Sequence, residues 1–146
     1  MIQIRRIVCP TDFSPTAARA VDYAAEMARS FGAELTLLHV IPEMNYPLRS
    51  FGMASAFPHL REELHQRAAD ELAAVKAKIA GARVDTLLRD GEAHEQVLAT
   101  TKALGADLIV MGTHGHTGLK HALLGSTAEK VVRLSDCPVL TVRTQN

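Results

Sequence analysis

Three glycines and a serine in the C-terminal third of the chain have a spacing suited to holding phosphate groups. Gly112, Gly115 and Gly125 are separated by two and by nine residues, and Ser126 follows directly. Glycine lets the backbone approach a ligand closely and adopt positive φ, which turns successive N–H groups toward an anion. Gly125 and Ser126 also open a predicted helix, whose first N–H groups and positive dipole end bind anions without Lys or Arg. The segment therefore predicts a phosphate site built from backbone groups.

A purely structural interpretation of the same residues stays open. Ser126 and Glu129 have the Ser-x-x-Glu spacing of a helix capping box, and the glycines can shape a solvent-exposed loop. The two interpretations are compatible, because the Ser126 hydroxyl can cap the helix in the empty protein and contact phosphate in the occupied one.

A second group of candidate residues follows the first predicted strand. Pro10, Thr11 and Asp12 lie there, and they share the carboxyl edge of a parallel sheet with Met111 and Gly112. Ligands of open α/β sheets bind at this edge, beside the point where the strand order reverses. A carboxylate is unfavourable beside phosphates, so we place Asp12 at the nucleoside end as an acceptor for adenine or ribose. The alternative is that Asp12 caps the N-terminus of the first helix.

Two widespread phosphate motifs are missing from the sequence. No G-x-G-x-x-G follows the first strand, and no Gly-Lys-Ser/Thr occurs, which argues against a standard dehydrogenase and a P-loop ATPase. Lys120 and His114 are the only nearby side chains suited to phosphoryl transfer, so binding is favoured over fast hydrolysis. Slow ATP hydrolysis or self-phosphorylation stays open as an alternative, without assigned catalytic residues. The candidate acceptors are the hydroxyls of Thr113, Thr117, Ser126 and Thr127.

The elements that must position these residues alternate along the chain. Apolar segments rich in β-branched residues predict five strands, at residues 4–9, 35–41, 83–89, 108–111 and 139–142. Helical patterns separate them: from Ser14-Pro15 to Gly32, from Pro58 to Gly81, over residues 92–104, and from Ser126 onward. Such alternation predicts a parallel sheet with helices on both faces, in one α/β domain over residues 1–146.

Charge and hydropathy restrict the expected partners and location. The 16 Lys and Arg residues balance 16 Asp and Glu, so no net field attracts nucleic acid or an acidic membrane. The longest apolar stretch, residues 35–41, is far shorter than the roughly 20 residues that a membrane helix needs. We therefore expect a cytoplasmic protein that binds neither nucleic acid nor membrane.

A histidine cluster follows Gly112. Clustered imidazoles such as His114, His116 and His121 are metal ligands in accessible loops, but no carboxylate or thiol joins them at a useful spacing. Zinc binding is therefore the weaker interpretation, and we expect no metal held by the protein alone. Protonation of these rings below about pH 6.5 would instead favour a bound phosphate.

With these features in view, the chain resembles the universal stress protein family. The resemblance spans essentially the whole chain and rests on four segments: Pro10-Thr11-Asp12-Phe13-Ser14, Leu37-Leu38-His39-Val40, the Gly112/Gly115/Gly125-Ser126 spacing of the family's ATP-binding branch, and Cys137-Pro138-Val139-Leu140-Thr141-Val142. It implies a Rossmann-like fold of the adenine nucleotide alpha hydrolase type, with strand order 3-2-1-4-5 and the switch point between the first and fourth strands. It also implies a stress-response regulatory protein.

The resemblance further implies a ligand, ATP, with Mg²⁺ held mainly through the phosphates. By this likeness, Asp12 and the Val40 backbone would contact adenine, and the glycine segment would contact the ribose and the phosphates. The complete set of expected nucleotide-binding residues is Pro10, Thr11, Asp12, Val40, Met111, Gly112, His114, Gly115, Gly125, Ser126 and Thr127.

The implied assembly is a homodimer paired through the last strand, residues 139–142. An alternating apolar edge strand gains stability when another strand covers it. A monomer whose edge is shielded by Arg143 and the tail is one alternative, and a structural dimer that binds no nucleotide is another.

Overall fold

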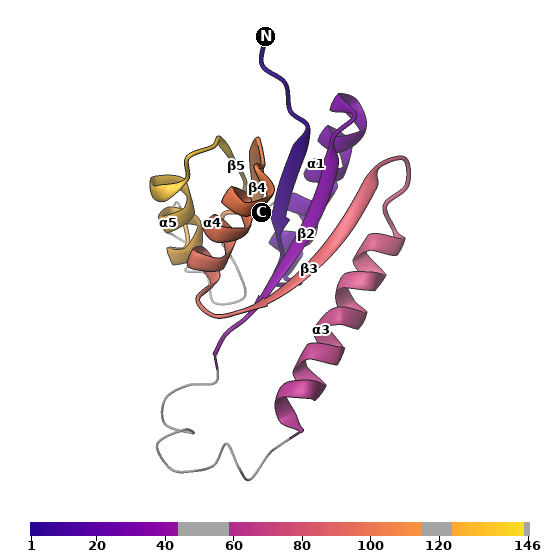
Figure 1. Cartoon of the computed structure of the whole chain (residues 1–146), viewed down its shortest axis with the longest axis vertical. Helices are drawn as coiled ribbons and strands as arrows, with labels where there is room; N and C mark the ends of the chain where they lie inside the picture. Colours follow the sequence, from indigo (N-terminus) through magenta and orange to yellow (C-terminus); the bar gives the residue numbers. More distant parts are fainter. Residues whose placement is uncertain (44–58, 115–123, 145–146) are drawn as a thin grey trace.

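Five strands form one parallel sheet in the order β3-β2-β1-β4-β5, as the resemblance implied (Figure 1). The computed structural model describes residues 1–43, 59–114 and 124–144. The strands are β1 (Arg6–Pro10), β2 (Glu34–Ile41), β3 (Arg83–Asp90), β4 (Leu108–Gly112) and β5 (Val139–Val142). The predicted α/β class and the parallel sheet are therefore confirmed.

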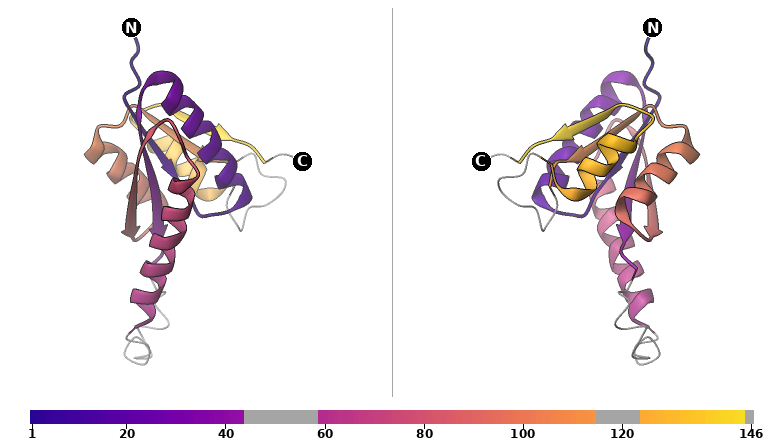
Figure 2. Two further views of the ribbon diagram at one scale, coloured as in Figure 1. Left: turned by 90° about the vertical axis from the view of Figure 1, so that its right-hand side faces the viewer. Right: turned by 90° about the vertical axis from the view of Figure 1, so that its left-hand side faces the viewer.

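Helices cover both faces of the sheet, α1 and α3 on one face and α4 and α5 on the other (Figures 1 and 2). Within the described residues they are α1 (Pro15–Phe31), α3 (Leu60–Ala77), α4 (Ala93–Leu104) and α5 (Ser126–Leu134). None of the helices in this part of the chain combines the length and the apolar character needed to cross a membrane.

The ends of α1 follow the predicted signals, whereas the second predicted helix ends earlier than expected. Ser14 caps α1 by accepting a hydrogen bond from Ala17 N at 3.1 Å, and Gly32 ends the helix at φ 64°. The second predicted helix ends earlier than Gly81, because the N–H groups after Ala77 bond to carbonyls only three residues back. Its expected start, Pro58, lies outside the described residues.

The first strand also differs from the prediction, since it runs from Arg6 to Pro10 rather than over residues 4–9. Its pairing with β2 sets these bounds: Arg6 is opposite Glu34, the first residue of β2, and Pro10 is opposite Leu38. Strand ends depend on the neighbouring strand, which an apolar pattern in one segment does not reveal.

The alternation of side chains along the strands divides the core into two layers. Ile7, Leu35 and Leu37 pack under α1 and α3, whereas Val8 and Leu38 pack under α4 and α5. Cys9 belongs to the first layer, and its burial raises the pKa of its thiol to about 12. The packing of these two layers against the faces of the sheet holds the carboxyl ends of the strands in place.

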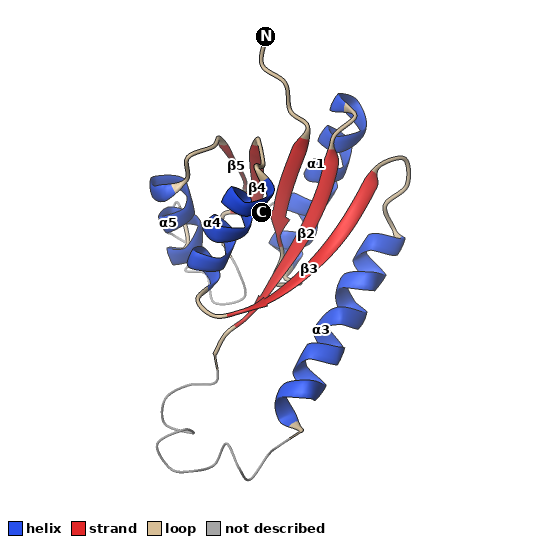
Figure 3. Ribbon diagram, viewed as in Figure 1, coloured by secondary structure: helices blue, strands red, loops and turns tan. Residues whose placement is uncertain are grey.

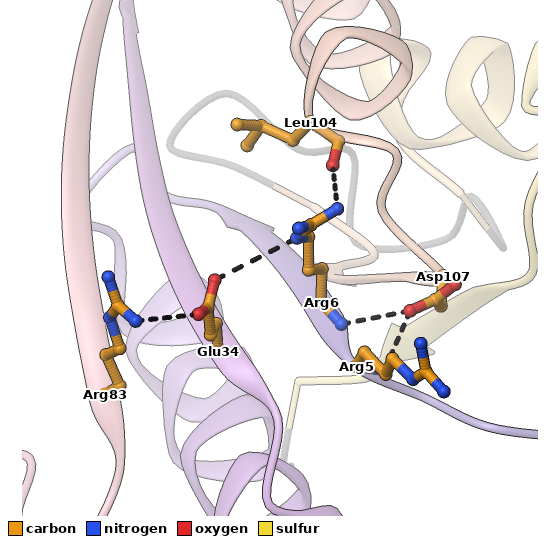
Figure 4. Close-up of polar contacts among 6 residues, drawn as sticks. All are labelled: Arg5, Arg6, Glu34, Arg83, Leu104 and Asp107. Atoms are coloured by element: carbon orange, nitrogen blue, oxygen red, sulfur yellow. Dashed lines mark hydrogen bonds and ion pairs between the residues drawn. The ribbon is translucent and has the colours of Figure 1, made fainter.

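Polar contacts fix the opposite, amino-terminal edge of the sheet (Figure 4). Asp107 Oδ2 accepts the backbone N–H groups of Arg5 at 2.8 Å and of Arg6 at 3.0 Å, which joins the start of β1 to the start of β4. Glu34 Oε1 accepts from Arg83 Nη1 at 2.9 Å, and Arg6 Nε lies 3.9 Å from Glu34 Oε2. These contacts set the register from which the strands run to the carboxyl edge.

An ionic cluster joins α3 to the end of the outer strand β3, beside which the helix runs (Figure 3). His65 Nε2 donates to Asp90 Oδ1 at 2.7 Å, and Arg61 Nη2 donates to Asp90 Oδ2 at 3.0 Å. Partial burial raises the pKa of Asp90, but the hydrogen bonds from His65 and Arg61 outweigh it and hold the pKa below its ordinary value.

Replacement of Asp90 is expected to reduce stability in a pH-dependent way. Because its pKa is lowered by folding, the stabilisation is complete above the ordinary carboxyl pKa of about 3.9 and disappears as the pH falls through the lowered value. Urea unfolding should therefore show Asp90→Asn less stable than the native chain at pH 7, with the difference shrinking below about pH 4. Asp85→Asn, at an exposed position of the same strand, is the control. An Asp90→Asn effect that is constant from pH 7 to pH 3 would contradict the assignment.

Candidate functional site

A cavity of about 460 Å³ opens at the carboxyl edge of the sheet, within the size range of small-molecule sites. It is bordered by the ends of β1, β2 and β4 and by the first turns of α4 and α5. Ten of the expected residues line it: Pro10, Thr11, Asp12, Val40, Met111, Gly112, His114, Gly125, Ser126 and Thr127. The remaining one, Gly115, lies outside the described residues.

The position of the cavity follows from the strand order. The chain steps from β1 outward through β2 to β3, then returns across the sheet to β4 and continues outward to β5. The segments after β1 and β4 therefore lead to helices on opposite faces, which leaves a gap between them. This gap is the switch point at which open α/β sheets bind ligands.

The turn after β1 is held by its own polar side chains. Thr11 Oγ1 accepts from Phe13 N at 3.1 Å, and Asp12 Oδ1 accepts from Ser14 N at 3.0 Å. Ser14 is the residue that caps α1, so the alternative role of Asp12 as the helix cap is wrong. Asp12 instead shapes the turn and borders the cavity.

Gly112 is required by close packing between β4 and α1. A Cβ atom at this position would lie 2.9 Å from Thr16 Cγ2 and 3.3 Å from the backbone carbonyl group of Thr16. Gly112 does not have positive φ, so the expected left-handed backbone is absent here. The absence of a side chain lets the first turn of α1 lie against the end of β4, where Gly112 and Ala17 both border the cavity.

Gly125 and Ser126 differ from the predicted capping box. The N-cap of α5 is Gly125 at φ −69°, Ser126 is the first helical residue, and no side chain among the described residues caps this helix. Gly125 N donates to Thr113 O at 2.6 Å, and a Cβ atom on Gly125 would lie 3.1 Å from that oxygen. The glycine thus joins α5 to the end of β4, and Ser126 borders the cavity.

The start of α5 brings backbone N–H groups of the kind that bind anions to the edge of the cavity. The N–H groups of Ser126, Thr127 and Ala128 precede the first intrahelical bond, in which Glu129 N donates to Gly125 O at 2.9 Å. Across the described lining, Asp12, His39 and His114 are the titratable side chains, and no Lys or Arg is among them. An anion here would be held by backbone N–H groups and the helix dipole.

His114 lies at the junction of β4 and α5. Its Nδ1 is 3.0 Å from Thr113 Oγ1, and its Nε2 is buried with no hydrogen-bond partner among the described residues. His116 and His121, which would complete the zinc cluster or the pH-sensitive cluster, lie outside the described residues, as do Thr117 and Lys120. Both interpretations of the histidine cluster therefore stay predictions.

Sequence reasoning missed the apolar wall of the cavity. The wall residues come from β2 and the residue after it, from the first turns of α4, and from α5 and the segment before it; they are Leu38, Pro42, Ala93, Val97, Leu124 and Ala128. Ala93 and Val97 are four residues apart, which places them on one face of α4. The four-residue spacing is visible in the sequence. The orientation of this face of α4 toward β2, however, depends on how the chain crosses the sheet from β3 to β4.

A parallel sheet of order 3-2-1-4-5 with a cavity at its switch point defines the Rossmann-like class of α/β proteins. Within this class, the chain belongs to the universal stress protein family, whose pattern it matches over residues 3–143.

Individual relatives are similar over nearly their full length. Universal stress protein MJ0577 of Methanocaldococcus jannaschii is 31% identical, with 99% of this chain and 98% of that protein aligned. The solved structure of MJ0577 matches with a TM-score of 0.83 and 33% identity over 99% of both chains. YxiE of Bacillus subtilis is 35% identical, with 94% and 98% of the two chains aligned. A universal stress protein solved in complex with cAMP has a TM-score of 0.65 and 28% identity, with 99% and 100% covered.

Substitution of Gly112 tests whether packing explains this glycine. Gly112→Ala is expected to destabilise the protein by about 1–3 kcal/mol, because the new methyl group overlaps Thr16. Thr16→Ser lacks Cγ2, so the double variant should recover part of the loss in urea unfolding. Additive effects of the two substitutions would contradict a direct contact.

Proposed function

We propose that the protein binds ATP or a related adenine nucleotide in this cavity and acts as a nucleotide-dependent regulator in the stress response. The supporting observation is that the start of α5, whose N-cap Gly125 has no side chain, and Asp12 border the same cavity at the switch point. One end then suits phosphates and the other suits a nucleoside. The family member solved with cAMP supports an adenine nucleotide as the ligand class.

The nucleoside end lies between β2 and α4. Ala93 and Val97 offer apolar surface to the faces of an adenine ring, and the backbone of Val40 offers hydrogen bonds to its edge. Asp12 would accept from ribose hydroxyls or from the adenine amino group, as proposed from the sequence. Pro10 and Thr11 would form the adjoining wall.

The phosphate end lies between β4 and α5. The N–H groups of Ser126 and Thr127 would bind the phosphate oxygens, with Gly112, His114 and Gly125 forming the floor. Gly115 and Met111 complete the proposed set of binding residues. Mg²⁺, if it accompanies ATP, would be held mainly through the phosphates.

One observation keeps a catalytic alternative in place. The Thr113 hydroxyl and His114 Nδ1 are 3.0 Å apart beside the proposed phosphate end, a distance suited to a nucleophile and its base. Self-phosphorylation would join Thr113 Oγ to the γ-phosphorus and release ADP, with the proton passing to His114. Binding is the primary proposal, because the described lining offers no cation to stabilise the transferred group.

A charge placed at the start of α5 tests the nucleotide site. Thr127→Asp is expected to raise the Kd for ATP by at least about tenfold, because its carboxylate repels phosphates. The same carboxylate suits the helix dipole, so the folded state should be retained. Thr127→Asn has the same shape as Thr127→Asp but no charge. Its affinity for ATP, measured by calorimetry, should be no more than about threefold below that of the native chain.

Adenosine serves as the second ligand, because it lacks phosphates and should bind both variants alike. Failure of the native chain to bind ATP, ADP or AMP at millimolar concentration would refute the proposal and favour a structural role.

Incubation with γ-labelled ATP, followed by measurement of ADP and of label on the chain, separates a binder from an enzyme.

We further propose that the protein is a homodimer paired through β5. Within the described part of the chain this strand has one neighbour, β4, and its residues Val139, Leu140 and Thr141 are only partly buried and uncharged. Val132 and Leu134 on the adjoining α5 are 44% and 52% exposed. The other edge strand, β3, carries several charged residues and is less suited to pairing.

The described part of the tail supports this choice over a shielded monomer. Arg143 O accepts from Arg19 Nη1 at 2.7 Å, and the Thr144 hydroxyl lies 3.0 Å from that of Thr16. Both contacts direct the residues after β5 toward α1, away from the open side of the strand.

Proline at position 141 tests the proposed pairing. Pro138 O accepts from Ile109 N of β4, and Val142 O accepts from Thr113 N, directly after β4. The backbone groups of successive residues point to opposite sides of a strand, so the N–H of Thr141 points away from β4. Thr141→Pro should therefore remove a hydrogen bond of the dimer while leaving the sheet intact. Sedimentation analysis is expected to show the native chain and Thr141→Val as dimers and Thr141→Pro as a monomer. A native chain that is monomeric at about 100 μM would contradict the pairing.

A further inference from the structure

The turn that carries Asp12 contains a strained residue. Phe13 has φ 63°, the left-handed region that side chains other than glycine rarely adopt. The surrounding contacts must hold such a residue in place, and residues of this kind concentrate at ligand-binding turns. The contacts that maintain this conformation therefore bear on the position of Asp12.

The imidazole of His39, on β2, makes two of these contacts. His39 Nδ1 lies 2.7 Å from the carbonyl oxygen of Thr11, and its ring centroid is 4.5 Å from that of Phe13, with the planes tilted by 35°. A carbonyl oxygen only accepts, so Nδ1 carries the proton and donates. One side chain thus holds the residues on both sides of Asp12.

The backbone explains why a side chain is needed at this point. The ladder between β1 and β2 continues as far as Thr11 N, which donates to Leu38 O at 2.8 Å. Beyond it the chain leaves the sheet toward the cap of α1, and the carbonyl of Thr11, a residue only 6% exposed, is bonded by the His39 ring. A buried carbonyl without a donor is costly, so loss of the ring would favour a different turn.

We propose that His39 is a positioning residue of the nucleotide site, which fixes the turn Thr11–Ser14 so that the Asp12 carboxylate faces the nucleoside end. This inference rests on the proposed function. His39 acts through the Thr11 carbonyl and the Phe13 ring, and the nucleotide contact belongs to Asp12.

Two variants of nearly equal shape separate the donor from the bulk of the side chain. In His39→Asn, the amide Nδ2 stands where Nδ1 of the imidazole stands and can donate to Thr11 O. His39→Leu has the same branching and no donor. Thermal unfolding of both variants establishes that the chain is folded under the conditions of the binding assay.

The first measurement uses the protein without nucleotide. The amides of Phe13 and Ser14, which donate to Thr11 Oγ1 and Asp12 Oδ1, should exchange with solvent at least about tenfold faster in His39→Leu. His39→Asn should restore most of the protection. Unchanged exchange in His39→Leu would show that the ring does not hold the turn, and would overturn the inference.

The second measurement is a double-mutant cycle with Asp12→Asn. His39→Leu is expected to raise the Kd for ATP by about tenfold in the native background and to have little further effect once Asp12 is replaced. Inorganic tripolyphosphate, which lacks the nucleoside, should bind His39→Leu as it binds the native chain. A merely structural role would weaken both ligands and would be additive with Asp12→Asn.

The outcomes distinguish this inference from the function on which it rests. Absence of ATP binding by the native chain would refute the nucleotide site and the positioning role with it. ATP binding that is retained by the native chain and by His39→Leu alike would leave the nucleotide site in place and refute the role of His39 alone.

Discussion

The return of the chain across the sheet between β3 and β4 is the constraint on which the rest of the structure depends. Right-handed crossovers place the helices after β1 and β2 on one face and those after β3 and β4 on the other. Among the described residues, no helix then crosses the carboxyl ends of β1 and β4, although these strands are neighbours. The cavity exists because the connectivity of the sheet leaves this gap.

Close backbone contacts, rather than flexible loops, define the described edges of the gap. Thr113 O accepts from Gly125 N at one side, and Leu38 O accepts from Thr11 N at the other. A Cβ atom at position 112 would overlap Thr16 of α1, and one at position 125 would lie in a tight contact, 3.1 Å from Thr113 O. The glycine spacing that indicates a phosphate site is therefore also a packing requirement. Phosphate binding and close packing each favour glycine at these two positions, and the structure shows the close packing directly.

The sequence predicted the features of the fold that depend on local pattern. Strand and helix alternation, the Ser14 cap and the Gly32 stop are each determined within a few residues, and they were correct. The sequence also predicted that the ends of β1 and β4 lie together, because the carboxyl ends of parallel strands share an edge of the sheet. What it missed depends on contacts between distant residues.

Three such features illustrate the limit. Gly125, the N-cap of α5, is bonded to Thr113, and Gly112 lacks positive φ because it is the last residue of β4 and pairs with Val142. The His39 ring meets Thr11 across 28 residues of sequence. No local propensity distinguishes these arrangements from the capping box or the solvent loop that the same residues also fit. Only the tertiary fold decides between them.

The bond between Thr113 N and Val142 O, at 2.9 Å, places the rim of the cavity and the open edge of the sheet in one ladder. Gly112 and Val142 are register partners, and Thr113 is bonded on its other side to the cap of α5. Any ordering of the rim that strengthened this bond would also restrain the last residue of β5, and by thermodynamic linkage the reverse effect would carry the same free energy. One hydrogen-bonded path therefore joins the cavity rim to the open edge of the sheet.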